Sequence, residues 1–328
     1  MEPTIHLEKP PAALSPFANW ACAHSFYDAV FQWLVQRIFG LSEPSVLLII
    51  GPTGVGKSTL INQFIRQLAL RMAGLMQADP SRLHAVYAEA VYLPSRGVDW
   101  EGLFTSLLRD ANDILIDRKV AKVWPPDRPG LRGLAAAVNA MLLHRAPAAC
   151  IIDEGGSLVE SDSVESLNRV LDYLKSLGNR SRTHIVIFGD YRLARMVHFN
   201  GQLNRRCHIM HFSNYPEGYR DQFELVVGTF EARLHAQKVQ ANLKVETDLL
   251  FAGTCGCVGL LKRWVENAWL MVAEADGKID RAVLETTQFP VGSVTKWRSE
   301  ITAGHDAVRA FFDGPKRSTG NQPTGRPV

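Results

Sequence analysis

The stretch GPTGVGKST, residues 51–59, constrains what this chain can fold into more than any other part of its sequence. It satisfies the pattern G-x-x-x-x-G-K-[S/T] through Gly51, Gly56, Lys57 and Ser58. The preceding SVLLII is typical of a buried parallel strand. Apolar residues then recur at helical spacing, namely Leu60, Ile61, Phe64, Ile65 and Leu68. Strand, loop and helix in this order predict a phosphate-binding loop.

The residue types in this loop suit a nucleotide. Glycines let the backbone N–H groups turn toward phosphates, and the start of the helix adds partial positive charge. We expect Lys57 to reach the β and γ phosphates and the Ser58 hydroxyl to bind Mg²⁺. The predicted ATP-binding loop comprises Gly51, Pro52, Thr53, Gly54, Val55, Gly56, Lys57, Ser58 and Thr59.

A second apolar run ends in two acids. AACIIDEGG places Asp153 and Glu154 after a buried strand, and the carboxyl ends of parallel strands meet at the edge where ligands bind. Asp153 therefore fits a carboxylate that holds Mg²⁺, and Glu154 fits the general base that deprotonates the attacking water. An adjacent Asp–Glu pair favours hydrolysis over transfer of the phosphoryl group to another substrate.

A helix beginning near residue 162 and stopping at Gly178 is predicted to lead to a third strand, THIVIFGD, which ends at Asp190. Asp190 stands where a residue that senses the γ-phosphate is expected, but capping of the next turn is an equally good interpretation. Arg205 and Arg206 precede a further strand, HIMHF. One of them is predicted to reach the nucleotide of a neighbouring subunit, and the alternative is a surface pair.

Downstream of these strands the pattern becomes helical, around residues 218–238, 243–253 and 258–274. Lys262 and Arg263 lie near the start of the last segment, where a cation is unfavourable unless an anion is close. Bound ATP would be that anion, and the alternative is a solvated basic pair. We therefore predict an N-terminal helical extension (1–43), a nucleotide-binding α/β domain (44–215), a helical lid (216–287) and a partly flexible basic tail (288–328).

Composition narrows the class of protein. With 46% apolar and 21% charged residues among 328, the chain is globular, and its length suits one large domain with a smaller appendage. No apolar run approaches the roughly 20 residues that cross a bilayer, and the first residues lack the pattern of a signal peptide. We therefore expect a cytoplasmic protein that does not contact membranes.

From Gly51 to about Thr287 the chain resembles an AAA+ ATPase of the TniB/TnsC type, the regulators of DNA transposition. The resemblance rests on the motifs above and on AVYLPSRGVDWEGLFTSLLRDAN, GDYRLARMVHFNGQLNRRC and GCVGLLKRWVENAW. It implies a P-loop parallel sheet between helices with a small C-terminal helical lid. It also implies ATP-dependent assembly into a ring or filament on duplex DNA, recruitment of a transposase with a target-selection protein, and disassembly on hydrolysis. The chain departs from the pattern at Gly155, Gly156 and Asp190.

DNA contact is expected from loops after the second strand and along the following helices, and an ordinary solvated surface is the alternative. The candidate residues are Arg96, Arg118, Lys119 and Lys122. Two other functions fit the same motifs. One is a different DNA-processing ATPase of this layout, such as a helicase loader or a repair switch, and the other is a nucleotide-gated scaffold that hydrolyses little ATP.

Overall fold

The computed structural model describes residues 15–17, 20–94, 97–113, 130–160, 164–194, 207–273 and 277–313. They divide into two compact units. The sheet unit takes its described residues from Leu34–Gly51, Leu68–His211 and Ser299–Val328. The helical unit takes its residues from Met1–Trp33, Pro52–Gln67 and Phe212–Arg298. Three helices contribute to both units, α1 (Ser25–Gly40), α2 (Lys57–Ala78) and α12 (Val291–Asp313).

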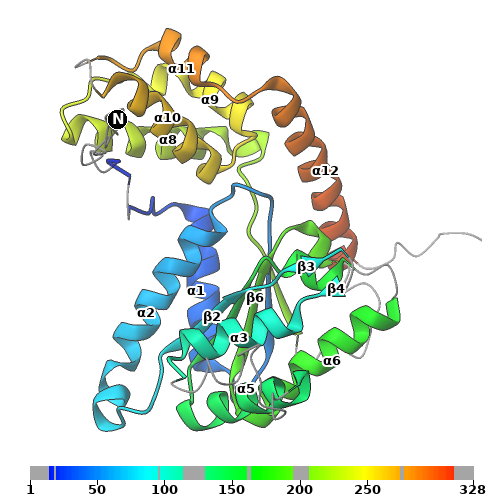
Figure 1. The fold of residues 1–328 in the computed structure, drawn as a ribbon. Coiled ribbons are helices and arrows are strands. Elements are labelled where there is room, and N and C mark those ends of the chain that lie inside the picture. Colours follow the sequence, from blue (N-terminus) through cyan, green and yellow to red (C-terminus); the bar gives the residue numbers. More distant parts are fainter. Residues whose placement is uncertain are drawn as a thin grey trace, which may run out of the picture. The chain divides into compact units, whose positions relative to one another are not determined.

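Five parallel strands form the centre of the sheet unit in the order β2-β5-β6-β1-β7. Figure 1 labels two of them, β2 and β6. They are β1 (Val46–Ile50), β2 (Ala85–Glu89), β5 (Ala149–Asp153), β6 (His184–Gly189) and β7 (Cys207–His211). Every residue of β1, β5 and β6 is buried, as expected for strands covered on both faces. Two short strands, β3 (Tyr92–Leu93) and β4 (Gly97–Val98), form an antiparallel pair. The predicted parallel sheet is confirmed.

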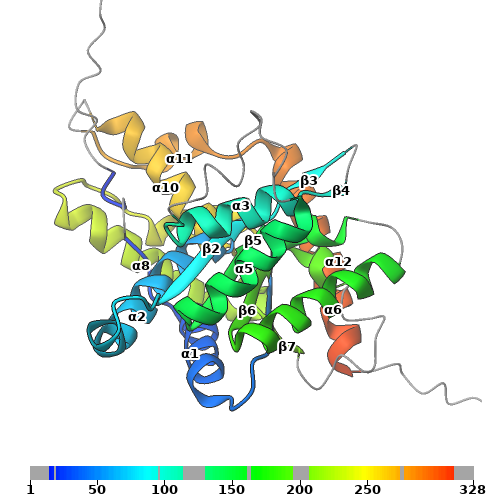
Figure 2. The same cartoon turned by 60° about the horizontal axis from the view of Figure 1, so that its bottom comes forward.

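Helices α3 (Trp100–Asp110), α5 (Leu131–Arg145) and α6 (Val164–Ser181) lie in a row over one face of this sheet (Figure 2). Their apolar faces join the strands in one buried cluster that includes Leu107, Val138, Leu171 and Ile152. Because all five strands are parallel, their carboxyl ends lie at one edge: Ile50 pairs in register with Gly189, and Glu89 with Asp153.

The predicted stop of α6 at Gly178 is wrong, because the helix continues to Ser181. Its end is formed instead by Arg182, which adopts a left-handed conformation with φ 56°. The N–H of Thr183 then donates to the carbonyl oxygen of Gly178 at 3.1 Å, the hydrogen bond of a Schellman motif. A Cβ on Gly178 would lie 3.0 Å from the carbonyl oxygen of Thr183, so the glycine makes room for the returning chain.

The helical unit contains α8 (Arg220–Ala236), α9 (Thr247–Thr254), α10 (Val258–Val272) and α11 (Arg281–Thr287), together with the first turns of α12. Its core is built around Trp264, Phe223 and Phe230, each fully buried. The three predicted helical segments correspond to α8, α9 and α10. No helix in the described part of the chain is long and apolar enough to cross a bilayer.

Candidate nucleotide-binding site

The phosphate-binding loop begins where β1 ends, at Gly51, whose N–H donates to the carbonyl oxygen of Gly189 at 3.1 Å. Two loop glycines have positive φ, 78° at Gly54 and 116° at Gly56. Side chains with a Cβ rarely adopt such conformations, so the loop needs glycine at both positions. The helix α2 then begins at Lys57, which directs its N-terminus toward the loop.

Lys57 lies folded over the loop that precedes it. Its ammonium nitrogen Nζ donates to the carbonyl oxygen of Pro52 at 3.0 Å. The next residue, Ser58, is exposed, and Thr59 is half-buried. An ammonium group, an exposed hydroxyl and a half-buried hydroxyl at the start of a helix are groups of the kind that can bind an anion.

The same loop contacts the start of α10. The N–H of Leu260 donates to the carbonyl oxygen of Gly54 at 3.0 Å, which satisfies one of the unpaired N–H groups of the helix end. A Cβ on Gly259 would lie 2.5 Å from the Gly54 oxygen and 3.2 Å from the Gly56 nitrogen. The close approach of helix and loop therefore depends on glycine at position 259.

Gly259→Ala is expected to destabilise the helical unit by about 1–3 kcal/mol, because its methyl group meets backbone that has no room to move. The matched control is Gly292→Ala, where an added Cβ meets nothing within 4 Å and a helical position gains from alanine. Denaturant unfolding measures both changes. Equal unfolding midpoints for the two variants would show that the contact between α10 and the loop is not tight in solution.

The predicted acids lie at the carboxyl end of β5. Asp153 is buried, only 4% exposed, and its Oδ1 accepts the N–H of Glu154 at 2.8 Å. Glu154 adopts a left-handed conformation, φ 52° and ψ 38°, which is uncommon outside glycine and carries backbone strain. Its side chain is exposed. The turn therefore keeps Asp153 within the sheet and presents Glu154 beyond the sheet edge.

A third carboxylate, absent from the sequence predictions, joins this edge. Glu89 ends β2 opposite Asp153 and accepts a hydrogen bond from the Tyr87 hydroxyl at 2.9 Å. Burial, this hydrogen bond and the charges of Asp153, Glu89 and Glu154 all raise the pKa of Tyr87. In the described part of the chain, no three His, Cys, Asp or Glu side chains are grouped closely enough to hold a metal ion by themselves.

Asp190, the predicted sensor, caps the 3₁₀ helix η2 (Tyr191–Ala194): its Oδ1 accepts the N–H of Arg192 at 2.9 Å. The Arg192 guanidinium also pairs with the Asp190 carboxylate, at 2.7 Å, and with Glu160. Hydrogen bonding to Asp190 is the main cause that raises the pKa of Arg192. The capping interpretation is therefore observed, and the negative charge of Asp190 is balanced by an arginine that the sequence analysis did not single out.

The two positions after Glu154 are occupied by glycine because a larger side chain would not fit there. A Cβ on Gly156 would lie 2.9 Å from the Asp190 carboxylate and 2.8 Å from the Arg192 guanidinium. A Cβ on Gly155 would clash with Ile187 and approach the Phe188 carbonyl oxygen to 3.0 Å. These glycines let the 3₁₀ helix η1 (Gly155–Val159) pack directly on the end of β6.

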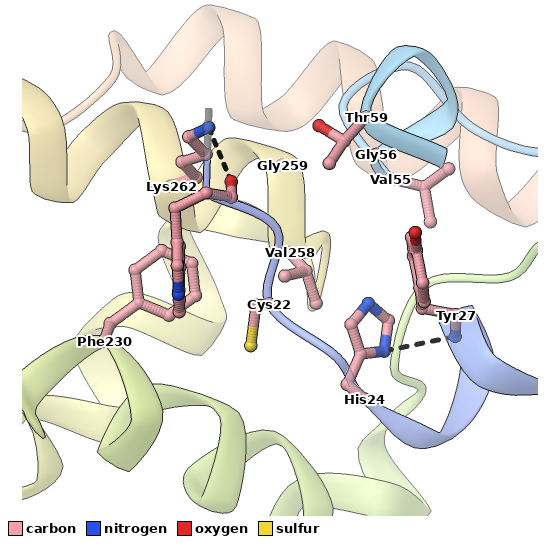
Figure 3. Close-up of a pocket in the computed structure, with 11 residues that line it drawn as sticks. Cys22, His24, Tyr27, Val55, Gly56, Thr59, Phe230, Val258, Gly259 and Lys262 are labelled. Carbon is pink, nitrogen blue, oxygen red and sulfur yellow. Dashed lines mark hydrogen bonds between the residues drawn. The ribbon is translucent and has the colours of Figure 1, made fainter. Parts of the chain in front are cut away.

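A small pocket of about 30 Å³ in the helical unit adjoins the loop (Figure 3). Its lining comes from three places in the sequence: the segment before and within α1, the loop with the start of α2, and α8 with α10. The lining residues are Trp20, Cys22, His24, Tyr27, Val55, Gly56, Thr59, Phe230, Val258, Gly259 and Lys262. The lining is mostly apolar and contains few polar groups.

The two predicted lid cations behave differently. Lys262 lines the pocket, and its Nζ donates to the backbone carbonyl oxygen of Trp20 at 3.2 Å (Figure 3). Arg263 is exposed and does not line the pocket. Arg96, Arg118, Lys119, Lys122, Arg205 and Arg206 lie outside the described residues.

The residues before and within α1 that line the pocket were not predicted from the sequence. Trp20, His24 and Tyr27 reach the loop across a long stretch of sequence, and no local motif marks them. His24 is 8% exposed, and burial lowers its pKa to about 4, so its imidazole is neutral at physiological pH. The only sequence signal was an aromatic-rich segment ahead of the first strand.

Comparisons with known proteins agree with this geometry. Residues 41–197 match the family model described as AAA domain. No curated protein sequence matches the chain. Among solved structures, the Aeropyrum pernix ORC2 protein is similar at 14% identity and TM-score 0.53, over 81% of this chain and 68% of that one.

Two more structures show the same likeness. The Walker-type ATPase of Pyrococcus abyssi has 12% identity and TM-score 0.51, over 88% of this chain and 76% of that one. The Aeropyrum pernix ORC1 protein, solved in complex with DNA, has 14% identity and TM-score 0.55, over 83% of this chain and 67% of that one. At such identities the likeness concerns the fold. The match over residues 41–197 and the likeness to these structures show that the chain has the P-loop AAA+ fold.

Proposed function

We propose that this chain binds ATP with Mg²⁺ and hydrolyses it. The observation that carries the proposal is the phosphate-binding loop, in which Gly54 and Gly56 adopt positive φ and α2 begins at Lys57. Such a loop presents backbone N–H groups and the N-terminus of a helix to phosphates. The AAA domain match over residues 41–197 supports the same activity.

Each residue has a distinct part in this proposal. The loop from Gly51 to Thr59 would hold the phosphates, with Lys57 on the β and γ groups, and Lys262 would contact the nucleotide from α10. Ser58 and Asp153 would hold Mg²⁺, which when bound neutralises charge on the phosphates. Glu154 would accept a proton from the water that attacks the γ-phosphorus.

For the biological role we propose an oligomeric regulator of DNA transposition in the cytoplasm. Support comes from the resemblance of the sensor and lid motifs to TniB/TnsC proteins. A protein of the same fold, ORC1, has been solved in complex with DNA. Arg205 or Arg206 would complete the site of a neighbouring subunit, while Asp190 acts through its pair with Arg192. DNA phosphates would be bound by Arg96, Arg118, Lys119 and Lys122, and a transposase and a target-selection protein would be the partners.

The fold favours one second candidate, a different DNA-processing ATPase such as a helicase loader, because two of the similar structures are ORC proteins. Both candidates act on DNA, so binding to duplex alone does not separate them. If a DDE-type transposase is encoded beside this chain, stimulation of its strand transfer would favour the regulator. Loading of a helicase onto DNA without such stimulation would favour the second candidate.

The first test is the ATPase rate with and without duplex DNA. We expect DNA to raise the rate, and the affinity for DNA to fall steeply with salt while depending little on sequence, because phosphates dominate the contact. ATP binding without turnover under both conditions would point to a nucleotide-gated scaffold. An ATPase rate that is the same with and without DNA would overturn the proposed role in transposition but not the proposed ATPase activity.

A further inference from the structure

The later turns of α12, from Ser299 onward, belong to the sheet unit and pack against η2. Gly304 is buried on this side of the helix, and a Cβ at its position would clash with the Tyr191 ring. One turn further along, Val308 is 5% exposed and joins the apolar cluster that contains Leu193 of η2. The Tyr191 ring therefore lies directly on the backbone of α12, in a notch that glycine leaves open.

Two histidines complete this contact. The Tyr191 hydroxyl lies 3.1 Å from Nε2 of His211, the last residue of β7. The ring of His305 on α12 meets the His211 ring edge-on, with the ring centroids 5.1 Å apart. Burial lowers the pKa of His211 to about 4, and burial together with Arg309 lowers the pKa of His305 against the opposing charge of Asp306. Both imidazoles are therefore neutral at physiological pH, so they pack together without charge repulsion.

The helix η2 also contacts the turn that carries Glu154. Gly156, two residues after Glu154, packs on η2 so closely that a Cβ there would lie 2.8 Å from the Arg192 guanidinium. Leu158 of η1 and Leu193 of η2 lie in the same buried cluster. The left-handed conformation of Glu154 persists only where the surrounding structure enforces it. The position of η2 is therefore one of the constraints on the backbone of Glu154.

We propose that Tyr191 is a positioning residue for ATP hydrolysis: seated in the Gly304 notch of α12, it holds η2 against η1 and so keeps Glu154 in place. The inference rests on the proposed function, in which Glu154 accepts a proton from the attacking water. The phosphate-binding loop is anchored separately, by the hydrogen bond from the Gly51 N–H to the Gly189 carbonyl oxygen. Loss of the notch contact should therefore slow hydrolysis and leave ATP binding intact.

Gly304→Ala tests the notch. The added methyl group displaces the Tyr191 ring, while alanine favours the helix, so α12 itself stays formed. We expect kcat for ATP hydrolysis to fall about 10- to 100-fold, the loss typical of a catalytic group held slightly out of place, and the Kd for ATP to stay unchanged. Phosphate release and calorimetry on the full chain measure the two quantities.

Gly292→Ala is the matched control, because it makes the same substitution in the first turn of the same helix. An added Cβ there meets nothing within 4 Å. This variant should equal the unaltered chain in both kcat and Kd.

Two substitutions of Tyr191 separate positioning from folding. Tyr191→Ala empties the notch, so kcat should fall as in Gly304→Ala, whereas Tyr191→Phe keeps the ring and should retain most of the rate. Because Gly304→Ala and Tyr191→Ala break the same contact, the double variant should be no slower than Tyr191→Ala alone. Calorimetric binding of ATP shows that each variant is folded.

Four outcomes overturn the inference. They are a normal kcat in Gly304→Ala, a rate of Tyr191→Phe as low as that of Tyr191→Ala, additive losses in the double variant, and a loss of ATP affinity that parallels the loss of kcat. In each case the unaltered chain still hydrolyses ATP, so the proposed function survives. Absence of ATP hydrolysis by the unaltered chain would overturn both.

Discussion

Replacing Glu154 with glutamine is expected to lower the rate of ATP hydrolysis by about 10²- to 10⁴-fold, the usual contribution of a general base. Glutamine has nearly the same shape, but it cannot take a proton from water at neutral pH. The Glu154 side chain is exposed, so the fold does not depend on it. ATP affinity should stay close to that of the unaltered chain, and the variant should accumulate as an ATP-bound oligomer on DNA.

Steady-state phosphate release and calorimetric ATP binding measure the two effects separately. Glu165→Gln is the matched control, because Glu165 is also an exposed acid and, among the described residues, pairs with Arg169 one turn along α6. It should leave the rate unchanged. Normal hydrolysis by Glu154→Gln would mean that another group activates the water, and Glu89, opposite Asp153, would be the next candidate.

Lys57→Ala is expected to reduce ATP affinity by about 10- to 100-fold, since a charge-assisted hydrogen bond contributes roughly 1.5–3 kcal/mol. Without ligand the melting temperature should change little, because Lys57 donates to the half of the loop that Gly51 already anchors. Added ATP should therefore raise the melting temperature of the unaltered chain much more than that of the variant.

Lys278→Ala serves as the control for removing a positive charge from the helical unit at an exposed position. It should retain both affinity and the ATP-dependent rise in melting temperature. If Lys57→Ala binds ATP as tightly as this control, the loop does not hold the phosphates and the proposed function is wrong.

The accurate predictions were those based on local sequence patterns, such as apolar runs and the helical spacing of apolar residues. The apolar runs before Gly51, Asp153, Asp190 and Ser213 became β1, β5, β6 and β7, because a strand buried on both faces leaves a continuous apolar signature. The helices α8, α9 and α10 followed from their spacing of apolar residues. The P-loop motif and the resemblance, together with this pattern, were enough to predict a parallel sheet, but not the order of its strands.

What the sequence did not reveal depends on contacts between distant segments. The helix α12 was not assigned, since the proline and glycine residues around it suggested irregular structure. Arg192 looked like any surface arginine until the fold placed Asp190 and Glu160 beside it. Trp20 and His24 line the pocket because the chain before the first strand packs against α8 and α10, a contact that no local pattern encodes.

The hydrogen bond from the Leu260 N–H to the Gly54 carbonyl oxygen limits which substitutions the loop and α10 tolerate. The first turn of α10 obtains a backbone partner from the loop that is proposed to carry the phosphates, so neither segment has a complete set of hydrogen bonds alone. Substitutions meant only to adjust the helix will alter loop geometry, and loop substitutions will loosen the helix. Natural variation in the two segments should therefore be paired, with insertions absent from both.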